Sequence, residues 1–273
     1  MSPAIGFAAD GDRRSLAKLY RVCFPKDEPA FWDWIFRNPY RAENTLVIRN
    51  EDKVISSLQM IPCAMRLNGQ RFAAHYIYAA ATLPAYRGAG LMAGLLSEAA
   101  AIGRARGHAF SVLITQEDSL LTYYGRFGYL SVLCCERKRT GAGILLPDET
   151  VRRAEERDIP ALNGLYEAAC GNLLHGVRTP EHWRGQLELF PEGAYLLEHC
   201  GEAAAYCFSD ERGCIEAVGK GSERLAGHLN GPGAEIQSPP CKEAVPMGCI
   251  RPLDPGAAAA VREARGYLNL MYN

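Results

Sequence analysis

Residues 83–96 (LPAYRGAGLMAGLL) join a predicted strand to a predicted amphipathic helix through a loop that contains Arg87, Gly88 and Gly90. Such a loop directs successive backbone N–H groups outward at a helix start, where the partial positive charge of the helix favours an anion. Glycine lacks the Cβ atom that would hold a ligand away from the backbone, and Arg87 can add a charge-assisted hydrogen bond. The stretch therefore predicts a site for a phosphate or a diphosphate.

Other interpretations of glycine-rich stretches in this chain are weaker. Residues 88–93 fit the dinucleotide pattern G-x-G-x-x-A, but they do not open a βαβ unit, and the next strand ends without an acidic residue. The loop can also be a turn that only begins a core helix. Gly219-Lys220-Gly221 does not form a P-loop, because no Ser or Thr follows the lysine.

The pattern around the loop predicts a mixed sheet. Strands at 45–48 and 54–62 flank a polar turn, and a second hairpin turns at Asn68-Gly69. Apolar residues at helical spacing predict a helix over 90–106, followed by a strand over 110–115 and a further short helix. This order is typical of an α+β fold with a mixed central sheet flanked by helices.

An internal echo predicts two related domains. Residues 5–20 and 151–166 align without a gap, and Asp12 and Asp158 occupy the same position near a predicted helix start. Any connection from a strand to a helix could share this pattern, so the echo alone leaves a single domain open. A glycine-rich stretch near residue 142 then separates domains at 1–142 and 150–273.

Composition excludes several classes of protein. The 273 residues include 30 Lys and Arg against 31 Asp and Glu, and no basic block is present to neutralise several phosphates of a nucleic acid. Charges interrupt the first twenty residues, and no stretch of about 18 apolar residues follows, so we expect a cytoplasmic chain without a membrane span. The ten cysteines include no C-x₂-C pair, which favours buried free thiols and no metal site.

Two motifs carry a resemblance to a known family. The pattern P-x-x-R-G-x-G is matched by Pro84, Arg87, Gly88 and Gly90, and the pattern Y-x-x-F-G-[YF] by residues 124–129 (YGRFGY). In this order the motifs resemble the GNAT superfamily of N-acetyltransferases. The second motif and a degenerate second GNAT-like domain look most like the enhanced-intracellular-survival (Eis-like) branch, without the sterol-carrier-like third domain of its larger members.

The resemblance implies a GNAT fold in two tandem domains and assigns the first domain to acetyl-CoA. Ser119 and Leu120 would line the channel for the cofactor. Met92 departs from the small residue that is common at its position, but the contact there is made by the backbone. The remaining residues implied to bind acetyl-CoA are Ala80, Ala81 and Thr82 for the pantetheine arm and Arg87, Gly88, Ala89, Gly90, Leu91, Met92 and Ala93 for the diphosphate.

The resemblance also implies that Tyr124 donates a proton to the departing thiolate. A packing role for the Tyr124 ring remains the simpler alternative. The general base is not evident from the residues, and the carboxylate of Asn273 is the candidate that larger relatives suggest. His75 lies on a segment near the acyl site, but a lone histidine in an apolar strand is more often structural.

The implied reaction is direct attack of a primary amine on acetyl-CoA through a tetrahedral intermediate. The amine can belong to a small molecule, an aminoglycoside-like compound or a peptide, and O-acyl transfer is not excluded. The second domain contains no P-x-x-R-G-x-G and no matching helix start, so we expect it to shape the amine pocket or the interface of a homo-oligomer. The alternative function is a non-catalytic acyl-CoA-binding regulatory protein.

Overall fold

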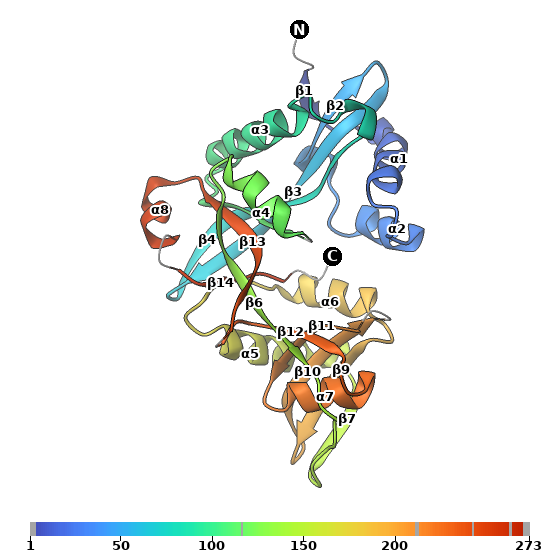
Figure 1. Cartoon of the computed structure of the whole chain (residues 1–273), viewed down its shortest axis with the longest axis vertical. Coiled ribbons are helices and arrows are strands. Elements are labelled where there is room, and N and C mark those ends of the chain that lie inside the picture. The colour runs from blue at the N-terminus through green and yellow to red at the C-terminus, as the bar shows by residue number, and fades with distance from the viewer. Residues whose placement is uncertain (1–3, 116, 211–212, 242, 262–263, 270–273) are drawn as a thin grey trace. The chain divides into compact units, whose positions relative to one another are not determined.

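The computed structural model describes residues 4–115, 117–210, 213–241, 243–261 and 264–269, which pack as two compact units (Figure 1). The first unit is formed within 1–65, 70–131 and 248–263, and the second within 66–69, 132–247 and 264–273. The ranges 1–142 and 150–273 stay a prediction about domain organisation. In the packing, a segment from the C-terminal part of the chain joins the first unit.

The first unit contains a mixed sheet, as predicted. Neighbouring strands β1 to β4 form a meander, β4 and β5 pair in parallel, and β13 pairs with β5 in the antiparallel sense. The turn between β3 and β4 lies at Asn68 and Gly69, whose φ values of 49° and 79° are those of a type I′ hairpin. The strands of this sheet, in spatial order, are β1 (Ile5–Phe7), β2 (Thr45–Asn50), β3 (Lys53–Leu67), β4 (Gln70–Thr82), β5 (Phe110–Ile114) and β13 (Val245–Pro252).

Helices cover both faces of this sheet. Figure 1 shows α3 on one side of the strands and α1 with α2 on the other. The rings of Tyr20 and Trp32 stack with centroids 4.6 Å apart, and Phe36 is buried beside them, so aromatic residues of α1 and α2 form part of the core. The helices are α1 (Arg13–Cys23), α2 (Pro29–Arg37), α3 (Leu91–Ala105), α4 (Asp118–Gly125) and α8 (Pro255–Val261).

Strand β13 shows why a glycine is needed in a strand interior. Gly248 pairs with Ile114 of β5, and a Cβ atom at Gly248 would lie 2.2 Å from the carbonyl oxygen of Leu113. Only glycine permits this approach of the two backbones.

The second unit has a separate four-stranded antiparallel sheet in the order β7-β9-β10-β11, which repeats the order β1-β2-β3-β4 of the first unit. Strands β12 and β14 pair with β6, and β8 pairs with β14. The strands are β6 (Leu130–Arg139), β7 (Glu149–Arg153), β8 (Leu174–Gly176), β9 (Ala194–His199), β10 (Glu202–Asp210), β11 (Gly213–Gly219), β12 (Glu235–Ser238) and β14 (Gly266–Tyr267), and the helices α5 (Ile159–Cys170), α6 (Pro180–Leu189) and α7 (Ser222–Asn230).

The internal echo has the same local structure in both units. Asp12 and Asp158 each end a short 3₁₀ turn before the helix, and each accepts the N–H three residues upstream, from Ala9 at 2.7 Å and Glu155 at 2.8 Å. Each carboxylate also pairs with a guanidinium, from Arg49 in β2 or Arg152 in β7.

Two further findings concern the whole described part of the chain. All ten cysteines are free, and they range from fully buried to exposed, so burial holds for some of these thiols and not for all. No helix of the described residues combines the length and the apolar composition needed to cross a bilayer.

Candidate functional site

The loop between β4 and α3 presents unpaired backbone N–H groups. Gly88 and Gly90 have φ values of 81° and 75°, in the left-handed region that favours glycine. Gly94 donates to the carbonyl oxygen of Gly90 at 3.1 Å, so the preceding N–H groups of the helix start have no intrahelical acceptor, and Gly90 as the N-cap residue has no side chain that could accept from them.

The space in front of these groups is open. A Cβ atom placed on Gly88 or Gly90 would have no protein atom within 4 Å among the described residues. The residues of the loop from Arg87 to Gly90 are exposed, and Met92 and Ala93 in the first turn of α3 are half-buried. The Nε of Arg87 donates to the carbonyl oxygen of Thr82 at 3.1 Å, and the guanidinium also interacts with the thiol of Cys23, so Arg87 is held beside the loop. This arrangement fits a diphosphate.

Strands β4 and β5 separate before they reach this loop. In the described structure the parallel register covers Ala74 to Tyr76 on β4, whereas β4 continues to Thr82. Ala79 has a φ of 47°, a left-handed conformation that is uncommon for alanine and marks an irregularity at the point where the ladder has ended. The separation provides a gap in the sheet along which an extended ligand could lie.

Ala80, Ala81 and Thr82, the predicted residues at the end of β4, differ in which backbone groups already have a hydrogen-bond partner. The carbonyl oxygen of Ala81 accepts from Ser56 at 3.1 Å, and that of Thr82 accepts from Cys23 and Arg87. Leu83 donates to Ile55 of β3, so by strand alternation Ala80 directs its backbone groups away from β3. Of these residues, Ala80 is therefore the best placed to bind a ligand in the gap.

Helix α4 carries the other predicted residues of the first unit. Ser119 and Leu120 lie in its first turn, where the Ser119 hydroxyl donates to Glu117 at 3.3 Å. Tyr124 lies in its last turn, with its ring 5.8 Å from that of Tyr129 and 5.3 Å from that of Tyr123. Burial, followed by the neighbouring Tyr129 and Tyr123, raises the pKa of Tyr124 far above its ordinary value. This phenol stays protonated across the physiological pH range.

His75 is held under α3. Its Nδ1 lies 2.9 Å from Nδ1 of His108, and its ring would contact any side chain at Gly103 of α3. Burial, followed by the charges of His108 and Arg106, lowers the pKa of His75 to about 3. The histidine is therefore a neutral core residue, as the structural alternative predicts.

The general base is not located by the described residues. Asn273 lies outside them, and so do the residues from 270 onward. Glu117 and Asp118 are exposed at the start of α4. In the described part of the chain, no three His, Cys, Asp or Glu side chains gather as a metal site.

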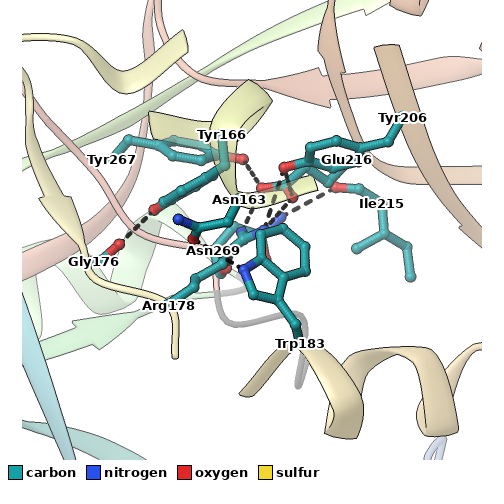
Figure 2. A network of polar contacts seen from close by, with 10 residues as sticks. All are labelled: Asn163, Tyr166, Gly176, Arg178, Trp183, Tyr206, Ile215, Glu216, Tyr267 and Asn269. Atoms are coloured by element: carbon teal, nitrogen blue, oxygen red, sulfur yellow. Dashed lines mark hydrogen bonds and ion pairs between the residues drawn. The ribbon is translucent and has the colours of Figure 1, made fainter. Parts of the chain in front are cut away.

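The second unit contains a buried polar network that the sequence analysis missed (Figure 2). Arg178 and Glu216 are fully buried and form a bidentate pair with two N–O distances of 2.7 Å. Tyr206 and Tyr267 each donate to Glu216, and Arg178 lies 4.0 Å from the ring centroid of Tyr166. Because Glu216 accepts from both tyrosines as well as from arginine, all of its strong acceptor positions are used within the protein.

This network fixes the last described segment of the chain. The Nη2 of Arg178 donates to the carbonyl oxygen of Asn269 at 2.6 Å, and Tyr267 belongs to β14. The sequence signal was weak: Glu216 is isolated in an apolar stretch, but nothing local marks Arg178 as its partner, because their pairing depends on long-range contacts. Four protein donors thus occupy Glu216, and the network connects separate elements of the second unit.

Comparison with known proteins gives matches in sequence to one family and in structure to several acyltransferases. Residues 5–131 match the family model described as acetyltransferase (GNAT) domain. A search of curated protein sequences gives no significant match.

The structure is similar to that of a GCN5-related N-acetyltransferase from Kribbella flavida (TM-score 0.70, 17% identity, 94% of this chain and 74% of that chain). It is also similar to a probable N-acyltransferase from Enterococcus faecalis (TM-score 0.70, 12% identity, 93% and 73%). A third similar structure is Eis1 from Mycobacterium abscessus (TM-score 0.67, 14% identity, 93% and 75%). At these identities the likeness establishes the fold. Residues 5–131 thus match the model of a GNAT acetyltransferase domain, and the chain has the fold of the acyl-CoA N-acyltransferases.

Proposed function

We propose that this protein is an acetyl-CoA-dependent N-acetyltransferase that acts on a primary amine. The observation that carries the proposal is the open row of N–H groups from Gly88 to Ala93, which fits the diphosphate of coenzyme A. The guanidinium of Arg87 adds a positive charge beside it. A loop that binds a ligand must leave space beside its backbone, and residues 88–93, here called the diphosphate cradle, are open in this way and not packed as a turn.

The gap between β4 and β5 supports a binding site for the pantetheine arm of acetyl-CoA. The backbone groups of Ala80, with the N–H of Thr82, would hold the pantetheine arm in the position that a neighbouring strand would otherwise take. Ala81 contributes less, because its carbonyl oxygen already accepts from Ser56. Ser119 and Leu120 at the start of α4 would line the other side of this channel.

Tyr124 would supply the proton for the departing sulfur. Its phenol is neutral at physiological pH, so it can donate a hydrogen bond toward the thiolate that forms when the thioester is cleaved. The neutral form of the amine attacks, and the proton that it loses would pass to a general base that the described residues do not identify. The second unit, with its matching strand order, would be a degenerate GNAT-like domain of the Eis-like branch that shapes the acceptor pocket or a subunit interface.

The first experiment asks whether the cofactor binds and whether the acetyl group moves. Calorimetry with acetyl-CoA tests binding, and a radiolabelled acetyl-transfer screen covers small amines, aminoglycosides and peptide N-termini. An amide product supports the proposal. Binding without product across the screen would instead identify a non-catalytic acyl-CoA-binding protein, whereas no heat with acetyl-CoA at millimolar concentration contradicts both.

The second experiment replaces the proposed acid. Tyr124→Phe removes the donor hydroxyl and keeps the ring, so we expect kcat to fall by about 10- to 1000-fold while the affinity for acetyl-CoA is unchanged. Tyr123→Phe is the matched control, because Tyr123 neighbours Tyr124 on α4 and is only half-buried. An unchanged kcat in the Tyr124 variant would remove this residue from the mechanism.

A further inference from the structure

A pocket of about 780 Å³ lies in the first unit between α1 and the turn that joins β2 to β3. Its volume lies within the range of roughly 300–1,000 Å³ that is usual for small-molecule sites. The apolar residues of the lining are Leu19, Val22, Val54 and Leu83, of which Val22 is exposed and the other three belong to the core beneath the pocket. The remaining lining residues are mostly charged or polar.

Four cationic side chains surround this pocket. Arg14, Lys18 and Arg21 follow one another at helical spacing on one face of α1, and Lys53 lies across from them on β3. None of the four forms an ion pair with another described residue, although the nearby Arg49 is paired with Asp12. The turn contributes two carboxylates, so the lining retains a net positive charge.

The pocket is distinct from the proposed diphosphate cradle. Leu83 lines the pocket and directly precedes the loop, but no residue from Gly88 to Ala93 lines it. The amide of Asn50, on the rim, donates to the hydroxyl of Tyr86 in the loop at 3.0 Å. The two sites are therefore neighbours that share a contact between their walls.

We propose that this pocket is a second ligand site, for a small organic phosphate that carries an aromatic ring, such as a nucleoside diphosphate. The apolar lining would receive the ring, and the unpaired cations would bind the phosphate oxygens with charge-assisted hydrogen bonds. The pocket would take such a ligand while acetyl-CoA occupies the cradle, and its contact with Tyr86 gives the ligand a route to affect that loop. This site does not depend on the chain being an acetyltransferase.

The test is calorimetric titration of ADP into the protein saturated with acetyl-CoA, since ADP alone could also enter the diphosphate cradle. We expect binding, and we expect Lys18→Glu to weaken it by about tenfold or more, because the new carboxylate repels phosphate from the middle of the cationic face. Lys26→Glu makes the same change of charge on an exposed residue outside the pocket, and we expect it to leave the ADP affinity within about twofold. Both variants should bind acetyl-CoA as the parent does.

Each alternative result overturns the proposal. ADP that gives no heat at millimolar concentration shows that the pocket takes no nucleotide. An equal loss in both variants shows that only the net charge matters. ADP that is displaced by acetyl-CoA, together with weaker acetyl-CoA binding in Lys18→Glu, shows that the pocket holds the nucleotide end of that cofactor. If acetyl-CoA itself does not bind, the ADP titration is made on the free protein, so the two proposals fail separately.

Discussion

Helices α3 and α7 both begin after a glycine in the left-handed conformation. Gly90 has φ and ψ of 75° and 8°, and Gly221 has 91° and 7°. Each helix follows the last strand of a four-strand meander, β4 in the first unit and β11 in the second. The second unit therefore does contain a matching helix start, which corrects the expectation that it has none, although the P-x-x-R-G-x-G motif is missing.

The surroundings of the two glycines differ. A Cβ at Gly90 would meet open space, whereas one at Gly221 would lie 2.7 Å from Leu197 and 2.9 Å from Arg224. The strand-to-helix connection in the second unit consists only of Lys220 and Gly221, compared with the long loop before α3.

The charged side chains near the two helix starts also differ. Near the start of α7, Arg224 pairs with Glu149 and Lys138 pairs with Glu223, while Arg87 beside α3 contacts a backbone carbonyl. A similar backbone at a helix start thus has two different surroundings. The glycine before α3 lies beside open space, whereas the glycine before α7 packs against Leu197 and Arg224.

The largest effect should come from breaking the polar network of the second unit. Arg178→Ala leaves Glu216 buried without its cation, which we expect to lower the free energy of unfolding by about 3–5 kcal/mol. Denaturant unfolding measures the loss, and acetyl-CoA affinity is measured on protein that remains folded. If the network is only structural, that affinity should stay unchanged.

Arg184→Ala provides the control for this measurement. Arg184 pairs with Glu156 on the surface, where such a pair contributes about 0–1 kcal/mol. Similar losses in the two variants would show that the buried network is not the special feature of the second unit. Loss of acetyl-CoA binding in folded Arg178→Ala protein would show that the network serves the ligand site.

A smaller effect on stability is expected from substitutions that compare the two helix starts directly. Gly90→Ala and Gly221→Ala each place a Cβ in the left-handed region, at a cost of about 1–2 kcal/mol of unfolding free energy. The Gly221 variant should lose more unfolding free energy than the Gly90 variant, because its added Cβ would clash with Leu197. Only Gly90→Ala should weaken acetyl-CoA binding, because its Cβ occupies the space proposed for the diphosphate. Calorimetry and denaturant unfolding on both variants give the comparison.

The opposite pattern would break the comparison. Equal acetyl-CoA affinity in Gly90→Ala and the parent would show that the open space before α3 is not the binding site. Weaker affinity in Gly221→Ala protein that remains folded would show that α7 also contributes to the site.

Local patterns in the sequence predicted the parts of the fold that depend on neighbours along the chain. The Asn68-Gly69 turn is one example, because Asn and Gly accept the positive φ values that a tight hairpin needs. The glycines at 88 and 90 predicted the start of α3 for the same reason.

Long-range contacts could not be predicted in this way. Strand β13 joins β5 from far along the chain, and the apolar run that forms it could pair with any open strand. The Arg178–Glu216 pair has no local pattern, because its members come from separate elements. The left-handed Ala79 was also missed, since alanine gives no signal for that conformation.

The smallest effect concerns the repeated 3₁₀ turn that precedes α1 and α5. Hydrogen bonds from Arg49 and Arg152 hold the pKa values of Asp12 and Asp158 below their ordinary value of 3.8. Because the folded state favours the charged form, each carboxylate stabilises the fold above about pH 4, and this stabilisation is lost as the pH falls through the lowered pKa. Asp12→Asn and Asp158→Asn should each cost about 1 kcal/mol at pH 7 and little at pH 2. Urea unfolding at both pH values measures this difference. Equal losses of unfolding free energy in the two variants would mean that the repeated 3₁₀ turn stabilises both units in the same way. A loss in Asp158→Asn alone would mean that the two turns have the same conformation but contribute differently to stability.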